Sequence, residues 1–385
     1  MMDADAIVVG GGLAGLAAAI AVAKAGLSTI HLAPPGPPDR RTSALMMPSV
    51  EYLQSAGLIG APEAFGQKLS QIRIIDATSR LLRAPETVFD AKEAGLDAFG
   101  WNFANVRLTE AFQASIEALP NLRTVAQPLT QFELSADGPK ITLADGGHLH
   151  APLVVGADGK KSLVRAAAGF RARENGFTQA ALVCDLELGR GLDGASVEFH
   201  YPNGPFTFVP AGGKRTNLVW IDEREVLKQA QALSKDALTA LLLEKSQRLF
   251  GAIALATPTH IFPLSTITVD HAGANGVVLV GEAAHAFPPI GAQGLNLGLR
   301  DVADLSGALA TIDRAEPDWA VRLSEDYARR RADDLSRTGG MVDTLFRSLL
   351  ADMLPAQALR AGGLWALKLL PALRKQAFAV GMGSR

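Results

Sequence analysis

The sequence predicts an α/β fold: a Rossmann-like dinucleotide-binding domain with an inserted antiparallel-sheet domain and C-terminal helices. Three observations predict it. Glycines with the spacing G-x-G-x-x-G follow a short apolar run at residues 6–9. Two later Val-rich runs, at residues 154–155 and 277–280, also lead into glycine turns, as buried parallel strands do. Elsewhere, apolar and polar residues alternate, which is typical of an antiparallel sheet.

The first element is a strand over Ala6–Val9, followed by Gly10, Gly12 and Gly15 and an alanine-rich helix over Leu16–Lys24. In this motif the first glycine makes a tight turn and the second lets a pyrophosphate approach the backbone. The third lets the helix pack on the strand. Glycines that merely turn the chain of an α/β protein are the alternative interpretation. The residues predicted to bind the dinucleotide are Gly10, Gly12, Leu13, Ala14 and Gly15.

A second glycine-rich segment covers residues 276–301 and is typical of flavin binding. Its strand, Val277–Val280, leads into Gly281 and Glu282, and this carboxylate is placed to accept hydrogen bonds from sugar-type hydroxyls. A helix is predicted from Gly294 onward. Its N-terminus would present unpaired N–H groups and partial positive charge, which stabilise a reduced, anionic isoalloxazine ring.

The turn between this strand and this helix contains a stiff Pro-Pro pair. We assign the flavin-ring environment to Pro289 and Gly294 and assign no acid or base residue. For His285 we favour a role in orienting the turn over proton transfer. The predicted cofactor contacts of the whole segment are Gly281, Glu282, Gly291, Gly294, Leu295 and Asn296.

A third segment consists of a strand ending at Gly156, a turn at Asp158 and Gly159, and Arg165 shortly after. Asp158 and Arg165 are predicted to hold ribose or phosphate groups near the flavin. The Gly159-Lys160 pair is similar to part of a nucleotide P-loop, but the required first glycine and the Ser or Thr after the lysine are both missing.

In this order and at these separations, the three segments resemble the aromatic-ring hydroxylase class of flavoprotein monooxygenases over most of the chain. Within that class, the runs Arg41–Leu45, Phe262–Leu264 and Gln293–Gly298 look most like the ubiquinone-biosynthesis hydroxylases. The chain departs from the family pattern at Ala33, where an acidic residue usually binds the adenosine ribose. It departs again at Glu282, where aspartate is usual. These changes concern FAD affinity more than fold.

The resemblance implies noncovalent FAD, with NAD(P)H and O2 as co-substrates. By it, NAD(P)H reduces FAD, O2 adds to give a flavin C4a-hydroperoxide, and the distal oxygen attacks the ring of a polyprenylated phenol. Arg107, at the start of a predicted helix over Leu108–Ala118, would contact the flavin diphosphate; otherwise it is a surface helix residue. Arg41 either meets phosphate or the nicotinamide cofactor, or is a solvated surface arginine.

Periodicity predicts a discontinuous FAD-binding domain, a two-piece substrate domain and a C-terminal helical region. The FAD-binding domain is assigned to residues 1–68, 99–175 and 270–325, the substrate-binding β-sheet domain to 69–98 and 176–269, and the helical region to 326–385. The basic, apolar stretch around Leu364–Phe378 either lies on an anionic membrane or a partner subunit, or packs on the flavin domain.

Composition predicts a cytoplasmic protein that associates with a membrane at most peripherally. The formal charge of −2 offers no basic field for nucleic acid. The single cysteine, Cys184, excludes an intrachain disulfide, and we find neither a signal peptide nor an apolar run of about 20 residues. No metal site is predicted, because His148 and His150 lack a third ligand.

The predicted partners are a hydrophobic polyprenylphenol and O2, with other ubiquinone-biosynthesis proteins or a membrane surface as further candidates. Two other functions stay open from the sequence. One is a flavin monooxygenase or oxidase that acts on a small soluble aromatic. The other is a non-catalytic flavin-fold scaffold that binds prenylated lipid, which the changes at Ala33 and Glu282 make conceivable.

Overall fold

The computed structural model describes residues 2–78, 84–135, 138–289 and 292–350, with side chains described to residue 340. A mostly parallel sheet forms the base of the molecule, with strands in the order β19-β20-β12-β1-β2-β8. This is the predicted Rossmann-like arrangement, so the fold class is confirmed. The bounds are β1 Ala6–Val9, β2 Thr29–Leu32, β8 Leu122–Val125, β12 Leu153–Gly156, β19 Gly273–Ala274 and β20 Val277–Leu279.

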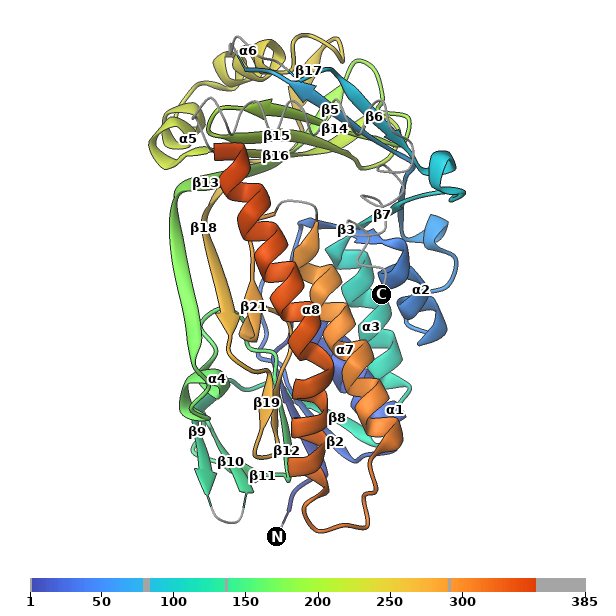
Figure 1. Cartoon of the computed structure of the whole chain (residues 1–385), viewed down its shortest axis with the longest axis vertical. Helices are drawn as coiled ribbons and strands as arrows, with labels where there is room; N and C mark the ends of the chain where they lie inside the picture. The colour runs from blue at the N-terminus through green and yellow to red at the C-terminus, as the bar shows by residue number, and fades with distance from the viewer. Residues whose placement is uncertain (1, 79–83, 136–137, 290–291, 351–385) are drawn as a thin grey trace.

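Helices α1, α3, α7 and α8 lie side by side along this part of the molecule (Figure 1). Helix α1 (Leu13–Lys24) is apolar on nearly all sides, and it is accordingly buried between the sheet and its neighbouring helices. It begins earlier than the predicted Leu16, directly after Gly12. The other bounds are α2 Met47–Ser55, α3 Asn105–Glu117, α4 Leu163–Ala167, α7 Gln293–Thr311 and α8 Trp319–Leu350.

A second, larger sheet lies at the other end of the molecule (Figure 1), and we call it the large sheet. Its strands follow the order β21-β18-β13-β16-β15-β14-β5-β6, with β17 paired to β13. The bounds are β5 Gln71–Asp76, β6 Thr87–Asp90, β13 Ala172–Leu188, β14 Ala195–Tyr201, β15 Gly204–Pro210, β16 Arg215–Glu223, β17 Ile253–Leu255, β18 His260–Val269 and β21 His285–Ala286.

Two distant pieces of chain meet in the large sheet, because β5 pairs in parallel with β14. Strand β13 is 17 residues long, and it runs with β18 down the side of the molecule toward the first sheet (Figure 1). The pairing of these two strands shifts register between Gly176 and Ala180. The domain boundaries given above stay a prediction.

The large sheet has two faces that differ in their neighbours. Helices α5 (Arg224–Gln231) and α6 (Lys235–Lys245) cover the outer face, where Leu218 and Trp220 are buried with aromatic side chains of β14 and β15. The inner face carries the alternate residues of β16, such as Asn217, and points toward the first sheet and its helices. This face is therefore a candidate wall of the substrate site.

Two small antiparallel sheets complete the fold. One, β3-β7-β4, lies between the large sheet and the first sheet with its helices. It consists of β3 Thr42–Met46, β4 Gly66–Leu69 and β7 Gly100–Ala104. The other was not predicted and consists of β9 Leu129–Ser135, β10 Gly138–Leu143 and β11 His148–His150. Short 3-10 turns are η1 Pro62–Ala64, η2 Ala91–Ala94 and η3 Gly281–Ala283.

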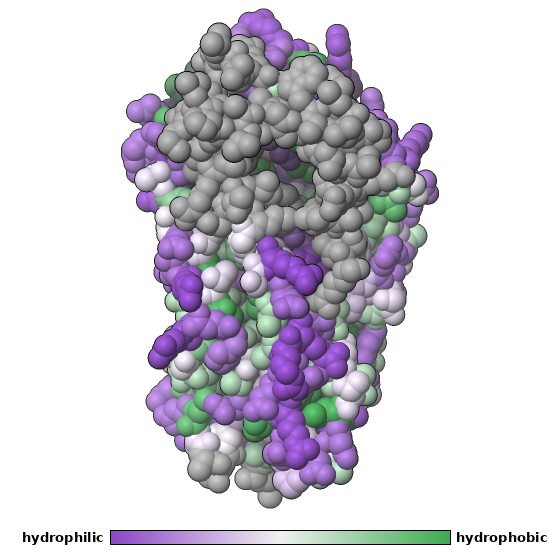
Figure 2. Space-filling model, in the orientation of Figure 1, coloured by the Kyte–Doolittle hydropathy of each residue, from purple (hydrophilic) through white to green (hydrophobic). Residues whose placement is uncertain are grey.

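Within the described residues, no helix combines the length and apolar character that crossing a bilayer requires. The outer side of α8 is hydrophilic along its visible length in Figure 2, where exposed arginines pair with acidic residues one turn away, as Arg330 does with Asp326. The predicted membrane or packing segment around residues 364–378 lies outside the described residues.

Candidate functional site

The three glycines that follow β1 have different surroundings. A Cβ atom on Gly10, whose φ is +132°, would lie 2.1 Å from the Ala157 carbonyl oxygen. A Cβ on Gly15 would lie 2.1 Å from the Gly10 oxygen, whereas a Cβ on Gly12 would meet nothing within 4 Å. The first and third glycines are therefore required by the protein's own packing, and the second leaves open space beside the start of α1.

Two helices, α1 and α7, begin at this end of the molecule. Neither α1 nor α7 has a side chain that caps its first turn. Gly294, in the first turn of α7, is exposed, and a Cβ there would meet no atom within 4 Å. An open glycine and uncapped N–H groups at both helix starts suit a phosphate and an anionic ring, so these residues fit FAD.

The two glycine-rich segments also contact each other directly. A Cβ on Gly298 would lie 3.4 Å from the Cα of Gly281 and 3.5 Å from the Cβ of Ala14. Gly298 therefore lies where α7 packs against the Gly281 turn and α1. Gly281 itself has a φ of +61°, a conformation that glycine adopts without strain.

Ala292 occupies a conformation that usually requires glycine. As the N-cap of α7 it has a φ of +56°, which costs a residue with a Cβ about 1 kcal/mol or more. The side-chain amide of Asn296 stabilises this conformation, because its Nδ2 donates to the carbonyls of Ala292 and Ala44. The Oδ1 of Asn296 accepts from the Met46 N–H, so its side chain ties α7 to β3.

Glu282 and Arg41 lie near each other although they are far apart in the sequence. Glu282 is exposed in η3, and its charge helps to raise the pKa of Arg41. The larger cause of that raised pKa is the hydrogen bond to Asp39, which accepts from Nε and Nη2 of Arg41 at 2.8 Å each. Asp39 also accepts from Asn105 Nδ2 at 2.9 Å. This Asp39–Arg41–Asn105 cluster was not predicted from the sequence.

Asp158 and Arg165 both make contacts within the protein. The Asp158 carboxylate accepts from the Ser162 hydroxyl at 2.5 Å and from the Leu163 N–H at 2.7 Å, so it stabilises the start of α4. Arg165 donates to the backbone oxygens of Ala283, at 2.9 Å, and Lys160, at 2.6 Å. Arg165 thus links this turn to the turn that contains Glu282. A ribose or phosphate contact for Asp158 stays a prediction.

The other predicted site residues differ in how far they are exposed to solvent. Arg107 lies in the first turn of α3, is exposed, and contacts only the Ala64 oxygen at 3.5 Å and Glu110 at 3.9 Å among the described residues. Pro289 is exposed, Leu295 is half-buried and Leu13 is buried. Gly291 lies outside the described residues.

Strand β2 contributes a buried histidine beneath the first glycine turn. The Nε2 atom of His31 lies 2.9 Å from the Gly10 carbonyl oxygen. Burial lowers the pKa of His31 and the contact with Gly10 offsets this only in part, so the ring is neutral at pH 7 and Nε2–H donates to that oxygen. Ala33 follows β2 where the family places its ribose-binding acid. The carboxylate contact implied by the resemblance is therefore missing at this position.

A buried ionic network lies behind the flavin segment and was not predicted. Asp301 Oδ2 accepts from the Gly281 N–H at 2.8 Å and contacts His285 Nε2 at 2.6 Å. Its Oδ1 lies 2.7 Å from Nε of Arg331 on α8, a side chain with no solvent exposure. This supports the structural role favoured for His285. The network holds the Gly281 turn against α7 and α8.

Opposite charges more than offset the cost of burying this network. Burial would raise the pKa of Asp301, but His285 and Arg331 hold it below its usual value. Asp334 behaves in the same way: burial opposes ionisation, yet Arg331 and Arg300 hold its pKa at about 2. The carboxylates and the guanidinium groups are therefore charged at neutral pH.

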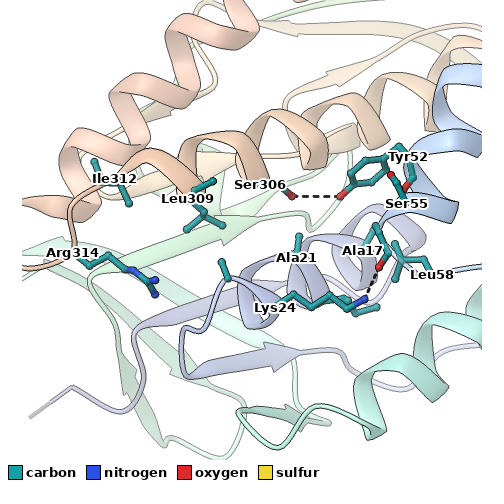
Figure 3. A pocket seen from close by; sticks show the side chains of 14 residues that line it. Ala17, Ala21, Lys24, Tyr52, Ser55, Leu58, Ser306, Leu309, Ile312 and Arg314 are labelled. Carbon is teal, nitrogen blue, oxygen red and sulfur yellow. Dashed lines mark hydrogen bonds between the residues drawn. The ribbon is translucent and has the colours of Figure 1, made fainter.

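A groove of about 460 Å³ lies between α1, α2 and α7, away from these glycine turns (Figure 3). Apolar side chains such as Ala21 and Leu309 line it, and the hydroxyls of Tyr52 and Ser306 meet across it at 3.5 Å. Lys24 reaches the carbonyl oxygen of Ala56 beside it. None of the predicted cofactor residues is among its described lining residues, so we assign it no part in cofactor binding.

We expect Glu282→Ala to weaken FAD binding without unfolding the protein, because the side chain is exposed in the middle of η3. A hydrogen bond from a ribityl hydroxyl to a carboxylate contributes about 1.5–3 kcal/mol, so the dissociation constant should rise about tenfold or more. Fluorescence titration of the apoprotein with FAD measures it, and Glu282→Asp is the control that should bind nearly as well. An unchanged affinity in Glu282→Ala would remove Glu282 from the site.

Comparison with known proteins agrees with this geometry. The model of the family described as "FAD binding domain" matches residues 3–334. The chain is 31% identical to a ubiquinone hydroxylase, UbiL, of Rhodospirillum rubrum, over 99% of this chain and 90% of the relative. It is 29% identical to the 3-demethoxyubiquinol 3-hydroxylase of Escherichia coli, over 98% of this chain and 97% of that protein.

The fold is also found in solved structures. The p-nitrophenol 4-monooxygenase PnpA of Pseudomonas putida superposes with a TM-score of 0.80 at 20% identity, over 99% of this chain and 98% of that one. An FAD complex of HpxO from Klebsiella pneumoniae superposes with a TM-score of 0.78 at 18% identity, over 98% and 97% of the two chains. From the matched family and these relatives, the chain belongs to the FAD-dependent aromatic-ring monooxygenases that include the ubiquinone-biosynthesis hydroxylases.

Proposed function

We propose that this enzyme hydroxylates the ring of a polyprenylated phenol, a hydrophobic precursor of ubiquinone, with NAD(P)H and O2 as co-substrates. The observation that carries the proposal is an apolar and partly open wall on the inner face of the large sheet. The relatives named above act in ubiquinone metabolism according to their names, which agrees with an apolar substrate. The two parts of this support are independent of each other.

The apolar wall is built from cross-strand pairs. Val183 of β13 lies opposite Val219 of β16, and Ala181 lies opposite Ile221. Val183 and Val219 are only half-buried although they lie in central strands. On the next strand, Phe262 lies opposite Ala181 and is 41% exposed. Burying such a surface under an isoprenoid tail would contribute about 25 cal/mol per Å².

A polar contact connects this wall to the flavin-binding part. Asn217, two residues before Val219 on the same face, accepts from Thr42 Oγ1 and from Asn102 Nδ2 at 2.8 Å each. Thr42 and Asn102 belong to β3 and β7, and β3 is tied to α7 through Asn296. A ring held against the wall would therefore lie between the large sheet and the start of α7.

The residues of the chain have defined tasks in this reaction. FAD, when bound, supplies the redox chemistry that activates O2. Gly12 and the start of α1 bind the diphosphate, and Glu282 orients the ribityl chain. The N-terminus of α7 stabilises negative charge on the reduced ring. The apolar wall positions the substrate ring and excludes water from the place of reaction.

The test is a turnover assay with a series of phenols that differ in tail length. Purified protein should show the visible absorbance of bound flavin, and a prenylphenol should stimulate NAD(P)H oxidation and give a hydroxylated product. Each buried methylene contributes about 0.8 kcal/mol, so adding one isoprene unit should lower KM about tenfold or more until the wall is covered. Equal use of small soluble phenols would favour the small-substrate alternative, and absence of flavin would favour the scaffold alternative.

Variants at two valines test whether the wall itself binds the tail. Val219→Asn should raise KM for a prenylphenol at least tenfold while leaving the flavin content unchanged, because it places an amide on the apolar wall. Val226→Asn is the matched control, since Val226 is 37% exposed on α5, the helix that covers the outer face of the large sheet. Equal KM values for both variants would contradict the proposed wall.

A polyprenyl tail partitions into a bilayer, so we also propose that the enzyme meets its substrate at a membrane surface. The same assay with the substrate carried in phospholipid vesicles tests this. Turnover should then depend on the fraction of protein that sediments with the vesicles. Equal turnover by protein that stays in solution would contradict the membrane proposal.

A further inference from the structure

A glutamate and a histidine lie next to each other on the inner face of the large sheet. On β14, Glu198 lies opposite Thr207 of β15, and His200 lies opposite Pro205. Phe199, between them, points to the outer face and is buried in the aromatic core. His200 Nε2 lies 3.3 Å from Glu198 Oε2. The two side chains therefore form a hydrogen-bonded pair on the side that faces the flavin-binding part.

The pair belongs to the same surface as the apolar wall. Thr207, opposite Glu198, lies opposite Val219 on its other side, and Val219 lies opposite Val183. Residues that lie opposite one another on adjacent strands form a row across the sheet. The row before this one on the same face contains Asn217, which contacts β3 and β7. Successive rows on one face are about 7 Å apart along the strands. Glu198 thus lies one row beyond the contact between the large sheet and the flavin-binding part.

The pair also differs, in its exposure to solvent and its hydrogen-bond partners, from the other ionisable residues described on this face. The Asp185 carboxylate accepts from Asn217 Nδ2 at 2.5 Å, and Asp76 accepts from the Thr78 hydroxyl and the Ala84 N–H. The remaining ionisable residues are exposed: Glu187, Arg215, Glu223 and His260. By contrast, the Glu198 and His200 side chains are 28% and 16% exposed. Glu198 and His200 are therefore partly buried and hydrogen-bonded to each other within this wall.

We propose that His200 is the catalytic residue that accepts the proton of the substrate's phenol hydroxyl, and that Glu198 positions it; this rests on the proposed function. Glu198 accepts from Nε2–H, which leaves Nδ1 as the proton acceptor. The O–H bond breaks, its electron pair stays on oxygen, and an N–H bond forms at Nδ1. The resulting phenolate donates electron density to the ring carbons, and Glu198 stabilises the imidazolium.

His200→Gln and Glu198→Gln test this assignment, with His148→Gln as the matched control because it removes an exposed histidine of β11, outside the large sheet. General base catalysis contributes about 10²–10⁴-fold, so kcat for a prenylphenol should fall at least 100-fold in His200→Gln. Flavin content and the rate of flavin reduction by NAD(P)H should match the wild type in all three variants. Because flavin content reports folding, a loss of activity with full flavin is not due to unfolding.

A spectral readout separates proton transfer from a structural effect. A prenylated nitrophenol should bind to the wild type as the coloured phenolate below its solution pKa, and to both variants as the phenol. Bound phenolate together with unchanged kcat in His200→Gln would overturn the proton acceptor while leaving the proposed function intact. A wild type that binds the probe as phenolate but hydroxylates no phenol would instead overturn the proposed function and leave the proton acceptor standing.

Discussion

Gly12→Val is expected to abolish FAD binding while the protein keeps its fold. A Cβ at this position would meet no atom within 4 Å beyond its neighbours in the chain, so we expect the apoprotein to accept a side chain there. The same side chain would occupy the space through which the pyrophosphate approaches the backbone at the start of α1. Purified Gly12→Val should therefore show native far-UV circular dichroism and no visible flavin absorbance, even after incubation with excess FAD.

Gly15→Val is the matched comparison in the same motif. Its Cβ would lie 2.1 Å from the Gly10 oxygen, so α1 has to move away from β1 or the protein has to unfold. Loss of flavin should then accompany loss of native structure, unlike in Gly12→Val. A Gly12→Val protein that purifies with its full flavin complement would contradict the placement of the pyrophosphate at this turn.

Arg331→Met is expected to be among the most destabilising single substitutions in the chain. Arg331 is fully buried and lies 2.7 Å from a carboxylate oxygen of each of Asp301, Asp304 and Asp334. Methionine replaces its volume but leaves the Asp301 carboxylate buried beside His285 without its guanidinium. Breaking a buried ion pair in this way typically costs about 3–5 kcal/mol of the free energy of unfolding. Urea denaturation followed by circular dichroism measures the loss.

The neighbouring residue on α8 provides the control for Arg331→Met. Arg330 pairs with Asp326 on the outer side of the helix, where both side chains are about one-third exposed. Exposed pairs of this kind contribute about 0–1 kcal/mol, so Arg330→Met should change stability little. Equal losses in the two variants would show that the buried network contributes no more than a surface pair. Flavin should also dissociate more readily from Arg331→Met, because Asp301 holds the Gly281 turn.

Local patterns in the sequence were sufficient to predict the fold class and the flavin segments. The strand Ala6–Val9 has the predicted bounds, and α7 begins one residue before the predicted Gly294. These features depend on residues that are close together in the chain, where the glycine spacing and the helix start are set by neighbours.

Features that depend on distant pairs could not be predicted in this way. The partners of Asp301 are Gly281, His285 and Arg331, and no local pattern indicates that α8 returns to this position. Gly298 of α7 lies against Ala14 of α1, a contact that likewise joins distant parts of the chain. The Glu198–His200 pair became visible only when the strand register placed it on the inner face. A single sequence lists the residues of such sites, but it does not show which of them contact each other in the fold.

The strand order of the first sheet has a consequence for how the chain folds during synthesis. Strand β1 pairs with β12, and β12 in turn pairs with β20, so this sheet closes only after residue 279 has been made. In the large sheet, likewise, β5 cannot pair with β14 until β14 has been synthesised. Contacts of such long sequence separation form late and slowly. The N-terminal βαβ unit, in which β1 already pairs with β2, therefore lacks its neighbour β12 on the other side of β1, and β12 lacks β20, until most of the protein exists.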